Sequence, residues 1–596
     1  MTTLKREPLQ IVEFDIDYCS RTYGSAPCTA TLTGTPTGVR KCFNTFFTCQ
    51  DTANYDVGTL TLRYAKNQNG LPLGTLIYPA LVSVSTNPTK INLGGVGDRI
   101  GSLGKRARVE IVLQDFTDSD IYTDKYRSGR VDGTAQTDEG GYNPQSRGTH
   151  FGKMRRRFPY YQGRAIRVLE GYVGDSLASM RTRNYVVTEW RGPDASGNVR
   201  ITASDILDLA NDDKALCPTP NSGVIQSDIS AAYLSTVTLT PSGVGNNEYD
   251  ASGFASIGSE IVSFTRSGDT VTLTGRAQYG STAATHTAGD SFQQCYVADD
   301  QLISDTLQDW LEDFAGVSSS FVPISNWQTE ETTWLSGYRL NGVVPKPTGV
   351  TKLISEVLEL GLFLYWDDID QEIKMVANRP IDPGSTIPSL TDGSAILEKT
   401  AQIADLHDKR LSRVIFWHGV LDYSDGTKDG NNFAKAYLTI DTSAEGANEY
   451  NQDRTHEIFC RWLGPNGDDT IAGTVAQRLK NRFRDTPREI SFAVDVKDES
   501  DTRPAAVIAV TSRVLQDDTG NSLPTNMQVT AVEESAPGHK LKVTAQTYTF
   551  AGRYGYITEN SRSDYAASSA SEQEAGTYIV GGSGTFGDGT GPYLMF

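Results

Sequence analysis

The sequence lacks the short motifs that mark the common classes of enzyme. It contains no H-E-x-x-H, no G-x-S-x-G, no phosphate-binding Walker loop and no C-x-x-C pair. Its six histidines are far apart along the chain: His150, His286, His407, His418, His456 and His539. Its carboxylates are scattered along the chain, and no two of them can be identified as a catalytic pair. We therefore expect a structural or interaction protein rather than an enzyme.

Long apolar runs and a positive charge balance are also missing. No run approaches the roughly 20 apolar residues of a membrane-spanning helix. The net charge is −19, which argues against a surface devoted to nucleic acid, because phosphate contacts need clustered Lys and Arg. The first residues, 1–8, have neither the apolar core nor the cleavage site of a signal peptide, so we do not expect a secreted, disulfide-forming protein.

What the chain does contain favours strands and turns. Glycine (56) and tyrosine (27) are frequent, and apolar and polar side chains alternate over 58–66, 82–93 and 106–116. Helices are predicted over three periodic segments, 301–314, 351–361 and 470–483, and a short capped helix is predicted to begin at Ser204. The basic run Lys153–Arg157 is interpreted as a solvated loop or as a partner for acidic surface on a neighbouring subunit, with nucleic acid as a third and weaker alternative. The sequence thus predicts a mainly β chain with a few short helices.

The length of 596 residues and the changes in pattern predict several domains. The predicted parts are a four-cysteine region (1–75), a first β domain with a long loop at 117–150 (76–233), an inserted small β module (234–297), an α/β helical domain (298–405), a second β domain (406–552) and a flexible Gly- and Ser-rich tail (553–596).

Four of the seven cysteines fall close together near the start of the chain. Cys19, Cys28, Cys42 and Cys49 have the spacing C-x8-C-x13-C-x6-C. Three interpretations stay open: two disulfides, a structural zinc site, or an iron–sulfur cluster. Disulfides suit secreted proteins. Structural zinc sites usually include a tight C-x2-4-C pair, which is absent here.

An iron–sulfur cluster is larger than a single ion, so its ligands can arrive from separate loops. Arg21, Arg40 and Lys41 lie next to cysteine positions and could offset the negative charge of a thiolate-bound cluster. The spacing therefore favours an iron–sulfur cluster, with zinc as the second choice.

Several segments together resemble one known family, over roughly residues 10–400. The segments are 40–51 with Tyr55, 83–92, 103–107 with Gln114, Asp115 and Asp120, 160–164, 192–195, 205–209, and 273–276 with Tyr279, Gly280, His286 and Gly289. As a set they are similar to the tail-tip or baseplate hub proteins of siphophages, which include the hub of gene transfer agents and the tail tip protein L of phage lambda.

The resemblance implies a [4Fe-4S] cluster held by Cys19, Cys28, Cys42 and Cys49. It also implies β-barrel-like hub domains that form a homotrimeric ring closing the end of the tail tube. The implied partners are the distal tail protein, the tape-measure protein and a central fibre or other tail tip proteins, with possible contact to the host envelope. The implied location is the tip of the virion tail, after assembly in the host cytoplasm.

Two other functions stay open on the sequence. One is a tail-borne hydrolase of envelope polysaccharides, and the other is a receptor-binding adhesin that uses the inserted module. For a hub, the excess of acidic residues suggests a tube lining that lets DNA pass without binding, because like charges repel phosphate.

Overall fold

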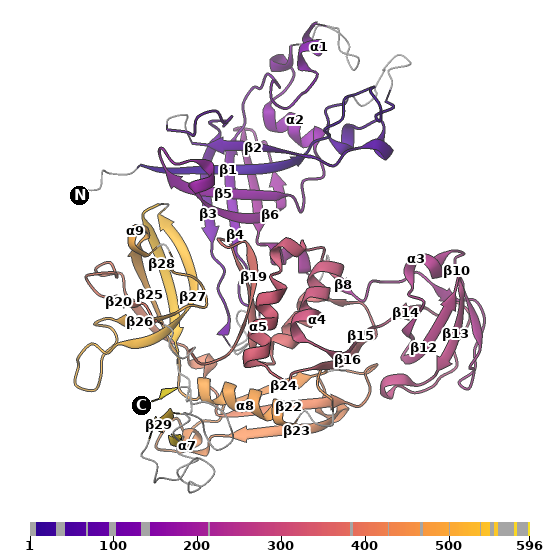
Figure 1. Cartoon of the computed structure of the whole chain (residues 1–596), viewed down its shortest axis with the longest axis vertical. Coiled ribbons are helices and arrows are strands. Elements are labelled where there is room, and N and C mark those ends of the chain that lie inside the picture. Colours follow the sequence, from indigo (N-terminus) through magenta and orange to yellow (C-terminus); the bar gives the residue numbers. More distant parts are fainter. Residues whose placement is uncertain are drawn as a thin grey trace.

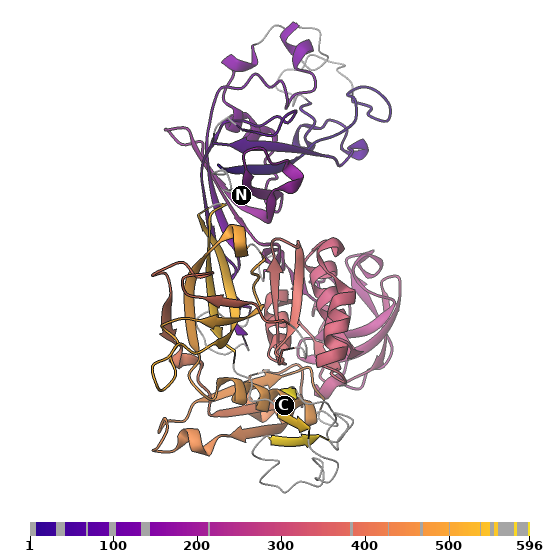
Figure 2. The ribbon, with the colours of Figure 1, turned by 60° about the vertical axis from the view of Figure 1, so that its left-hand side comes forward.

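The computed structural model describes an elongated chain built from several β-sheets and one helical core (Figure 1). The described residues are 7–30, 42–66, 70–93, 103–132, 143–211, 215–381, 386–426, 428–464, 469–499, 501–536, 538–548 and the strand segments 554–557, 577–580 and 594–595. Figures 1 and 2 show the N-terminal sheet at one end of the long axis, and the helical core and the later sheets below it.

The first β domain is a seven-stranded antiparallel sheet with the order β2-β1-β5-β6-β7-β4-β3. Its strands are β1 (Pro8–Asp17), β2 (Thr59–Ala65), β3 (Leu81–Asn87), β4 (Arg108–Gln114), β5 (Ala165–Tyr172), β6 (Arg181–Arg191) and β7 (Asn198–Ser204). Large apolar side chains such as Phe14, Phe151 and Trp190 fill its core. The predicted boundary between residues 1–75 and 76–233 runs through this sheet, because β1 pairs with β5.

The predicted long loop at 117–150 and the basic run after it contain helices. The helices are α1 (Arg127–Asp132) and α2 (His150–Arg157). Placing the basic run in a loop was wrong: it is the second half of α2, whose Phe151 and Met154 are buried against the sheet. Alternating buried and charged positions over one short helix give little sequence periodicity, which explains the error.

The inserted module is a six-stranded sheet with the order β14-β11-β12-β13-β10-β9. Its strands are β9 (Val224–Ile225), β10 (Thr236–Thr240), β11 (Ser252–Ile257), β12 (Glu260–Ser267), β13 (Thr270–Gly275) and β14 (Phe292–Gln294), with the short helix α3 (Val244–Glu248). The buried Glu260 carboxylate binds Arg276 and His286 and so ties the last loop to β12. The module extends to one side of the helical core (Figure 1).

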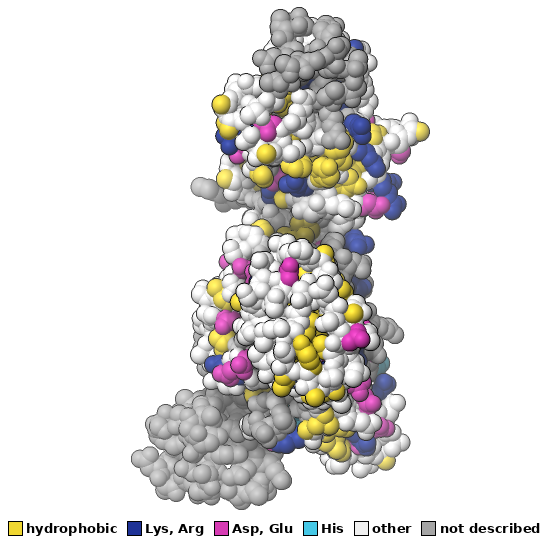
Figure 3. All heavy atoms as spheres, turned by 90° about the vertical axis from the view of Figure 1, so that its right-hand side faces the viewer, with side chains coloured by type: hydrophobic (Ala, Val, Ile, Leu, Met, Phe, Trp, Pro, Cys, Tyr) yellow, Lys and Arg dark blue, Asp and Glu magenta, His cyan; other side chains and the backbone are white. Residues whose placement is uncertain are grey.

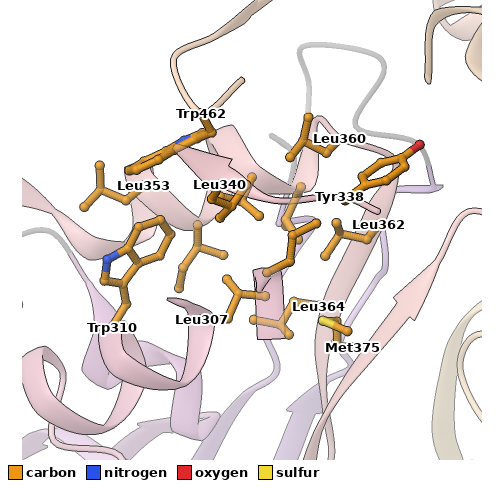
Figure 4. Close-up of a cluster of buried hydrophobic side chains, with 14 of the residues drawn as sticks. Leu307, Trp310, Tyr338, Leu340, Leu353, Leu360, Leu362, Leu364, Met375 and Trp462 are labelled. Atoms are coloured by element: carbon orange, nitrogen blue, oxygen red, sulfur yellow. The ribbon is translucent and has the colours of Figure 1, made fainter. Parts of the chain in front are cut away.

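The largest apolar core joins the helices to the sheets around them (Figure 4). The helical elements are α4 (Ile303–Asp309), a π-helical turn (Trp310–Phe314), α5 (Ile324–Trp334), α6 (Val350–Leu358) and α8 (Asp469–Phe483). The strands are β8 (Leu216–Cys217), β15 (Tyr296–Gln301), β16 (Leu340–Val344), β17 (Thr348–Gly349), β18 (Leu362–Asp367), β19 (Glu372–Ala377), β22 (Arg413–Val420), β23 (Phe433–Ile440) and β24 (Thr455–Cys460). Trp310 and Trp462 meet in this core with ring centroids 5.3 Å apart.

The C-terminal sheet has the order β20-β26-β27-β28-β25-β21 and its own apolar core. Its strands are β20 (Ser389–Thr391), β21 (Gln402–Asp405), β25 (Arg488–Asp495), β26 (Val507–Thr511), β27 (Thr525–Ala536) and β28 (Lys540–Thr547), and the short helix α9 (Val496–Glu499) follows β25. The short helix α7 (Thr442–Glu445) lies between β23 and β24. Three further strands lie in the range predicted as a flexible tail: β29 (Tyr554–Ile557), β30 (Thr577–Val580) and β31 (Leu594–Met595). They pair as a parallel sheet.

The predicted fold class is confirmed: the chain is mainly β and multidomain, with barrel-like sheets and few helices. Within the described residues, no helix is both long and apolar enough to cross a membrane.

Candidate four-cysteine metal centre

The four clustered cysteines lie at one end of the first β domain. Cys19 follows directly after β1, while Cys42 and Cys49 stand on either side of a short 3-10 helix, Phe46–Thr48. All seven cysteines of the chain are free thiols, so no disulfide joins the four. Of the flanking cations expected from the sequence, Arg21 is exposed, and Arg40 and Lys41 lie outside the described residues.

A reciprocal pair of hydrogen bonds fastens Cys19 to the segment that carries Cys42 and Cys49. The Cys19 backbone N–H donates to the Asn44 carbonyl oxygen (2.6 Å), and the Asn44 side-chain amide donates to the Cys19 carbonyl oxygen (3.1 Å). Asn44 is buried and has a φ of 61°, a left-handed conformation that asparagine tolerates better than most residues. Two loops distant in sequence are thereby held against each other.

The sulfur atoms lie close enough to influence one another electrostatically. Burial raises the pKa of the Cys42 thiol to about 11, and the nearby Cys49 and Cys28 thiols raise it further. Burial also raises the pKa of Cys49, with contributions from Cys19 and Cys28. At neutral pH Cys42 and Cys49 therefore hold their protons, and a bound metal must displace them.

A buried arginine supports the Cys42 end of the site. The Arg130 side chain is fully buried and donates through Nη2 to the Cys42 carbonyl oxygen. Its Nε binds the Asp124 carboxylate at 2.7 Å. The guanidinium carbons of Arg130 and Arg157 lie 4.3 Å and 3.8 Å from the centroid of the Phe43 ring, within the range of cation–π attraction. The charge of Arg130 lowers the pKa of Cys42, against the larger opposite effect of burial.

Tyrosines surround the same four sulfurs. The Tyr23 hydroxyl donates to Gln50 at 2.9 Å, and the Tyr23 backbone N–H donates to the Tyr126 hydroxyl at 2.7 Å. The Tyr55 hydroxyl donates to the Asp17 carboxylate at 2.8 Å. Burial, with the charge of Asp124 next, raises the pKa of Tyr18 to about 12. Cys19 is buried among these groups, whereas Cys28, Cys42 and Cys49 stay partly exposed.

The loop that carries Arg130 is held by three buried carboxylates and their cations. His150 Nδ1 pairs with Asp118 at 2.6 Å, and Lys153 and Arg157 of α2 bind Asp120 at 2.7 Å and 2.8 Å. The basic run therefore pairs, in part, with acidic groups of its own chain. Sequence reasoning missed Arg130 and Asp124, and the one available signal was the acidic triplet at 118, 120 and 124 ahead of a basic helix.

The donor set and its geometry test the proposed metal. In the described part of the chain, no three His, Cys, Asp or Glu side chains converge tightly enough to hold a metal ion. The four sulfurs are nevertheless close enough to shift one another's pKa. Four thiols are a donor set that both structural zinc sites and iron–sulfur clusters use.

An aromatic surface adjoins Cys49. Phe46 and Tyr160 are 43% and 52% exposed, and the Phe46 ring packs edge-on against Tyr55 with centroids 5.2 Å apart. Phe47 packs against Tyr160, and the Arg156 guanidinium lies 5.3 Å from the Phe47 ring. On the face drawn in Figure 3, hydrophobic side chains lie beside Lys and Arg side chains in the upper part of the molecule.

No known family profile and no curated protein sequence matches this chain. Solved structures with some likeness include a tail protein from Neisseria meningitidis MC58 (9% identity, 76% of this chain, 96% of that chain, TM-score 0.33). A second is the prophage MuSo2 43 kDa tail protein from Shewanella oneidensis (10% identity, 78% of this chain, 97% of that chain, TM-score 0.34). A third is the prophage tail protein gp18 from Listeria monocytogenes (12% identity, 65% of this chain, 86% of that chain, TM-score 0.27). Likenesses at these TM-scores do not establish a shared fold.

Proposed function

We propose that this chain is a structural hub at the distal end of a phage tail, and that an iron–sulfur cluster on Cys19, Cys28, Cys42 and Cys49 fastens its N-terminal loops. The observation that carries the proposal is the gathering of four free cysteines at one end of the first β domain. These are the positions at which the sequence resemblance to siphophage hub proteins places cluster ligands.

The cluster acts as a structural fastening in this proposal. When bound, it supplies four strong metal–sulfur links between loops that share little apolar core, and metal-binding energy is then folding energy. The chain's own residues do the remaining work. Asn44 holds Cys19 against the 42–49 segment, and Arg130 fixes the Cys42 backbone.

The proposed assembly is a homotrimeric ring that closes the tail tube at the tip of the virion. Its proposed partners are the distal tail protein, the tape-measure protein and a central fibre or other tail tip proteins. In this proposal the role of the chain is structural and not enzymatic. The mainly β, multidomain architecture suits such a ring, and the net charge of −19 suits a lumen through which DNA passes without binding.

The cluster is tested by metal analysis of the full chain purified without oxygen. We expect equal amounts of iron and acid-labile sulfide and a broad visible absorption band, all lost in the Cys42→Ser and Cys49→Ser variants. Cys295→Ala, which removes a buried free cysteine of the inserted module, is the matched control and should keep both. Stoichiometric zinc without iron, or cluster content unchanged by the Cys42 and Cys49 substitutions, would overturn the proposal.

The assembly is tested by the mass of the purified chain in solution. If the chain is a hub, we expect it to form trimers, either alone or after the distal tail protein is added. Analytical ultracentrifugation of each protein alone and of their mixture distinguishes these two cases. A chain that stays monomeric in both experiments contradicts the ring.

A further inference from the structure

Three parts of the chain meet around one buried arginine. Arg183 of β6 is 4% exposed and contacts three carboxyl groups, one from each part. Its nitrogens lie 3.3 Å from Glu170 of β5, 3.4 Å from Asp368 after β18, and 3.2 Å from Glu534 of β27. This junction joins the first β domain to the β18–β19 hairpin and to the C-terminal sheet, which lie below it in Figures 1 and 2.

A small cavity opens beside Arg183 in the junction. The cavity has a volume of about 20 Å³, which is enough for one water-sized molecule or ion. The charged and indole groups that line it are Arg181, Arg183, Arg503, Asp368 and Trp366. Three guanidinium groups thus face one carboxylate among the lining side chains.

Two of the side chains that line this cavity carry donors with no acceptor. Within the described residues, Nε and Nη1 of Arg181 and the indole Nε1 of Trp366 are buried without a hydrogen-bond partner. The nearest carboxylate oxygen to Arg181, on Glu534, is 3.6 Å from Nη1, which is too far for a good hydrogen bond. Leaving buried donors unsatisfied is unfavourable, so the arrangement calls for an acceptor.

The charge in the junction narrows the choice of acceptor. Burial lowers the pKa of Arg181, and the neighbouring Arg183 and Arg503 lower it further. Arg181 is thus a buried positive charge whose neighbours include both cations, Arg183 and Arg503, and anions, Glu534 and Asp368. A water molecule in the cavity can accept hydrogen bonds but leaves this charge in place, whereas an anion satisfies the donors and offsets the charge.

We propose that the cavity lined by Arg181, Arg183, Arg503 and Trp366 binds one small inorganic anion, of the size and charge of chloride. The anion accepts from the unpartnered Arg181 and Trp366 donors. Because Arg181 lies on β6, Trp366 on β18 and Arg503 just before β26, the bound anion links all three parts of the junction. Its binding stabilises the packing of the first β domain on the rest of the chain by mass action.

A direct test locates the anion. Crystals of the full chain are soaked in bromide, which scatters anomalously and replaces chloride with little change in size. We expect an anomalous peak in this cavity, with Arg181 and Trp366 nitrogens around it. A cavity that holds only water after the soak would overturn the proposal, whatever the behaviour of any variant.

A solution test measures the effect on stability. The buffer anion is changed stepwise from gluconate to chloride at constant ionic strength, because gluconate is too large for the cavity. Hydrogen exchange is measured in β5, β6 and β27. We expect chloride to slow exchange at the junction in a saturable way, and Arg181→Gln to abolish this dependence. Arg200→Gln, which changes an exposed arginine of the same sheet, is the control and should keep it. An equal chloride effect in the two variants, or none in the wild-type chain, contradicts the site.

Discussion

The side chain of Arg130 donates a hydrogen bond to the backbone carbonyl oxygen of Cys42, a residue 88 positions earlier in the chain. Arg130 is fully buried and also paired with Asp124. One side chain therefore joins the loop at 118–132 to the segment that carries two of the four clustered cysteines. The four-cysteine site depends on this loop even though the loop contributes no cysteine.

Replacing Arg130 by Gln is expected to loosen the site. The substitution leaves the Asp124 carboxylate buried without its cation, a change that typically costs about 3–5 kcal/mol. Opening of residues 42–55 should then become more than about 100-fold more frequent, since each 1.4 kcal/mol is a factor of ten. Hydrogen exchange of peptides from this segment measures it.

The control for Arg130 is Arg191→Gln, which removes an exposed arginine whose pair with Glu189 lies in solvent. Exposed pairs contribute little to stability, so this variant should exchange like the wild-type chain. If the two variants behave alike, Arg130 does not hold the site together.

Asn44 makes two separable contributions, one through its side chain and one through its backbone. Asn44→Gly removes the hydrogen bond to the Cys19 carbonyl oxygen but allows the φ of 61°. Asn44→Ala removes the same bond and adds about 1 kcal/mol or more of backbone strain. Alkylation of the buried Cys19 thiol, counted by mass spectrometry, should therefore rise in the order wild type, Gly, Ala. Equal rates for Gly and Ala would show that the left-handed conformation is unimportant.

In the inserted module, Glu260 is expected to make stability depend on acid pH. Although its burial opposes ionisation, hydrogen bonds from Arg276, the Ala284 N–H and His286 lower the pKa of Glu260 to about 2. The unfolded chain binds this proton near pH 4.5, so the stabilisation is complete above that pH and is lost as the pH falls toward 2.

Glu260→Gln should remove this dependence and destabilise the module at neutral pH, because Arg276 loses its buried partner. Hydrogen exchange in β12 and β13, compared between variant and wild type at each pH, gives the measurement. The difference between them should be large at pH 7 and shrink toward pH 3. A constant difference would mean that Glu260 does not titrate in this window.

Much of this fold is predictable from the sequence because its strands are half-buried. The alternation over 58–66 and 106–116 corresponds to β2 and β4, and the periodic segments at 351–361 and 470–483 correspond to α6 and α8. The strand β1 escaped prediction because it lies inside its sheet and is buried on both faces over much of its length, which removes the alternation. The helix α5 escaped because only Trp327 and Glu331 are buried on it.

The candidate site also has a part that the sequence predicts and a part that it does not. The four cysteines are conspicuous in the sequence by their spacing alone. Arg130, Asp124 and Tyr126 reach them from the loop at 117–150, and no local pattern connects residues that are brought together only by folding. That the cysteines hold a cluster stays a prediction, as do the trimer and its partners.

The junction around Arg183 should weaken as the pH rises. Burial raises the pKa of Glu170 to about 8, with a hydrogen bond to the ionised Glu534 adding to the effect, so Glu170 is a neutral acid at pH 7. In the unfolded chain Glu170 loses its proton near pH 4.5. Between pH 4.5 and about 8 the folded chain holds one more proton than the unfolded chain, so stability falls as the pH increases, and above about 8 the loss is complete.

Glu170→Gln tests this, because the amide can donate to Glu534 as the neutral acid does and cannot ionise. Hydrogen exchange in β5 and β27 should accelerate with pH in the wild-type chain relative to the variant, once the intrinsic exchange rate is divided out. The variant should be the more protected of the two at pH 8. Glu110→Gln, an exposed carboxylate of the same sheet, is the control and should follow the wild-type chain. If Glu170→Gln instead lowers protection equally at pH 5 and pH 8, Glu170 is ionised throughout, and its carboxylate acts as a counter-ion to Arg183 rather than as a hydrogen-bond donor to Glu534.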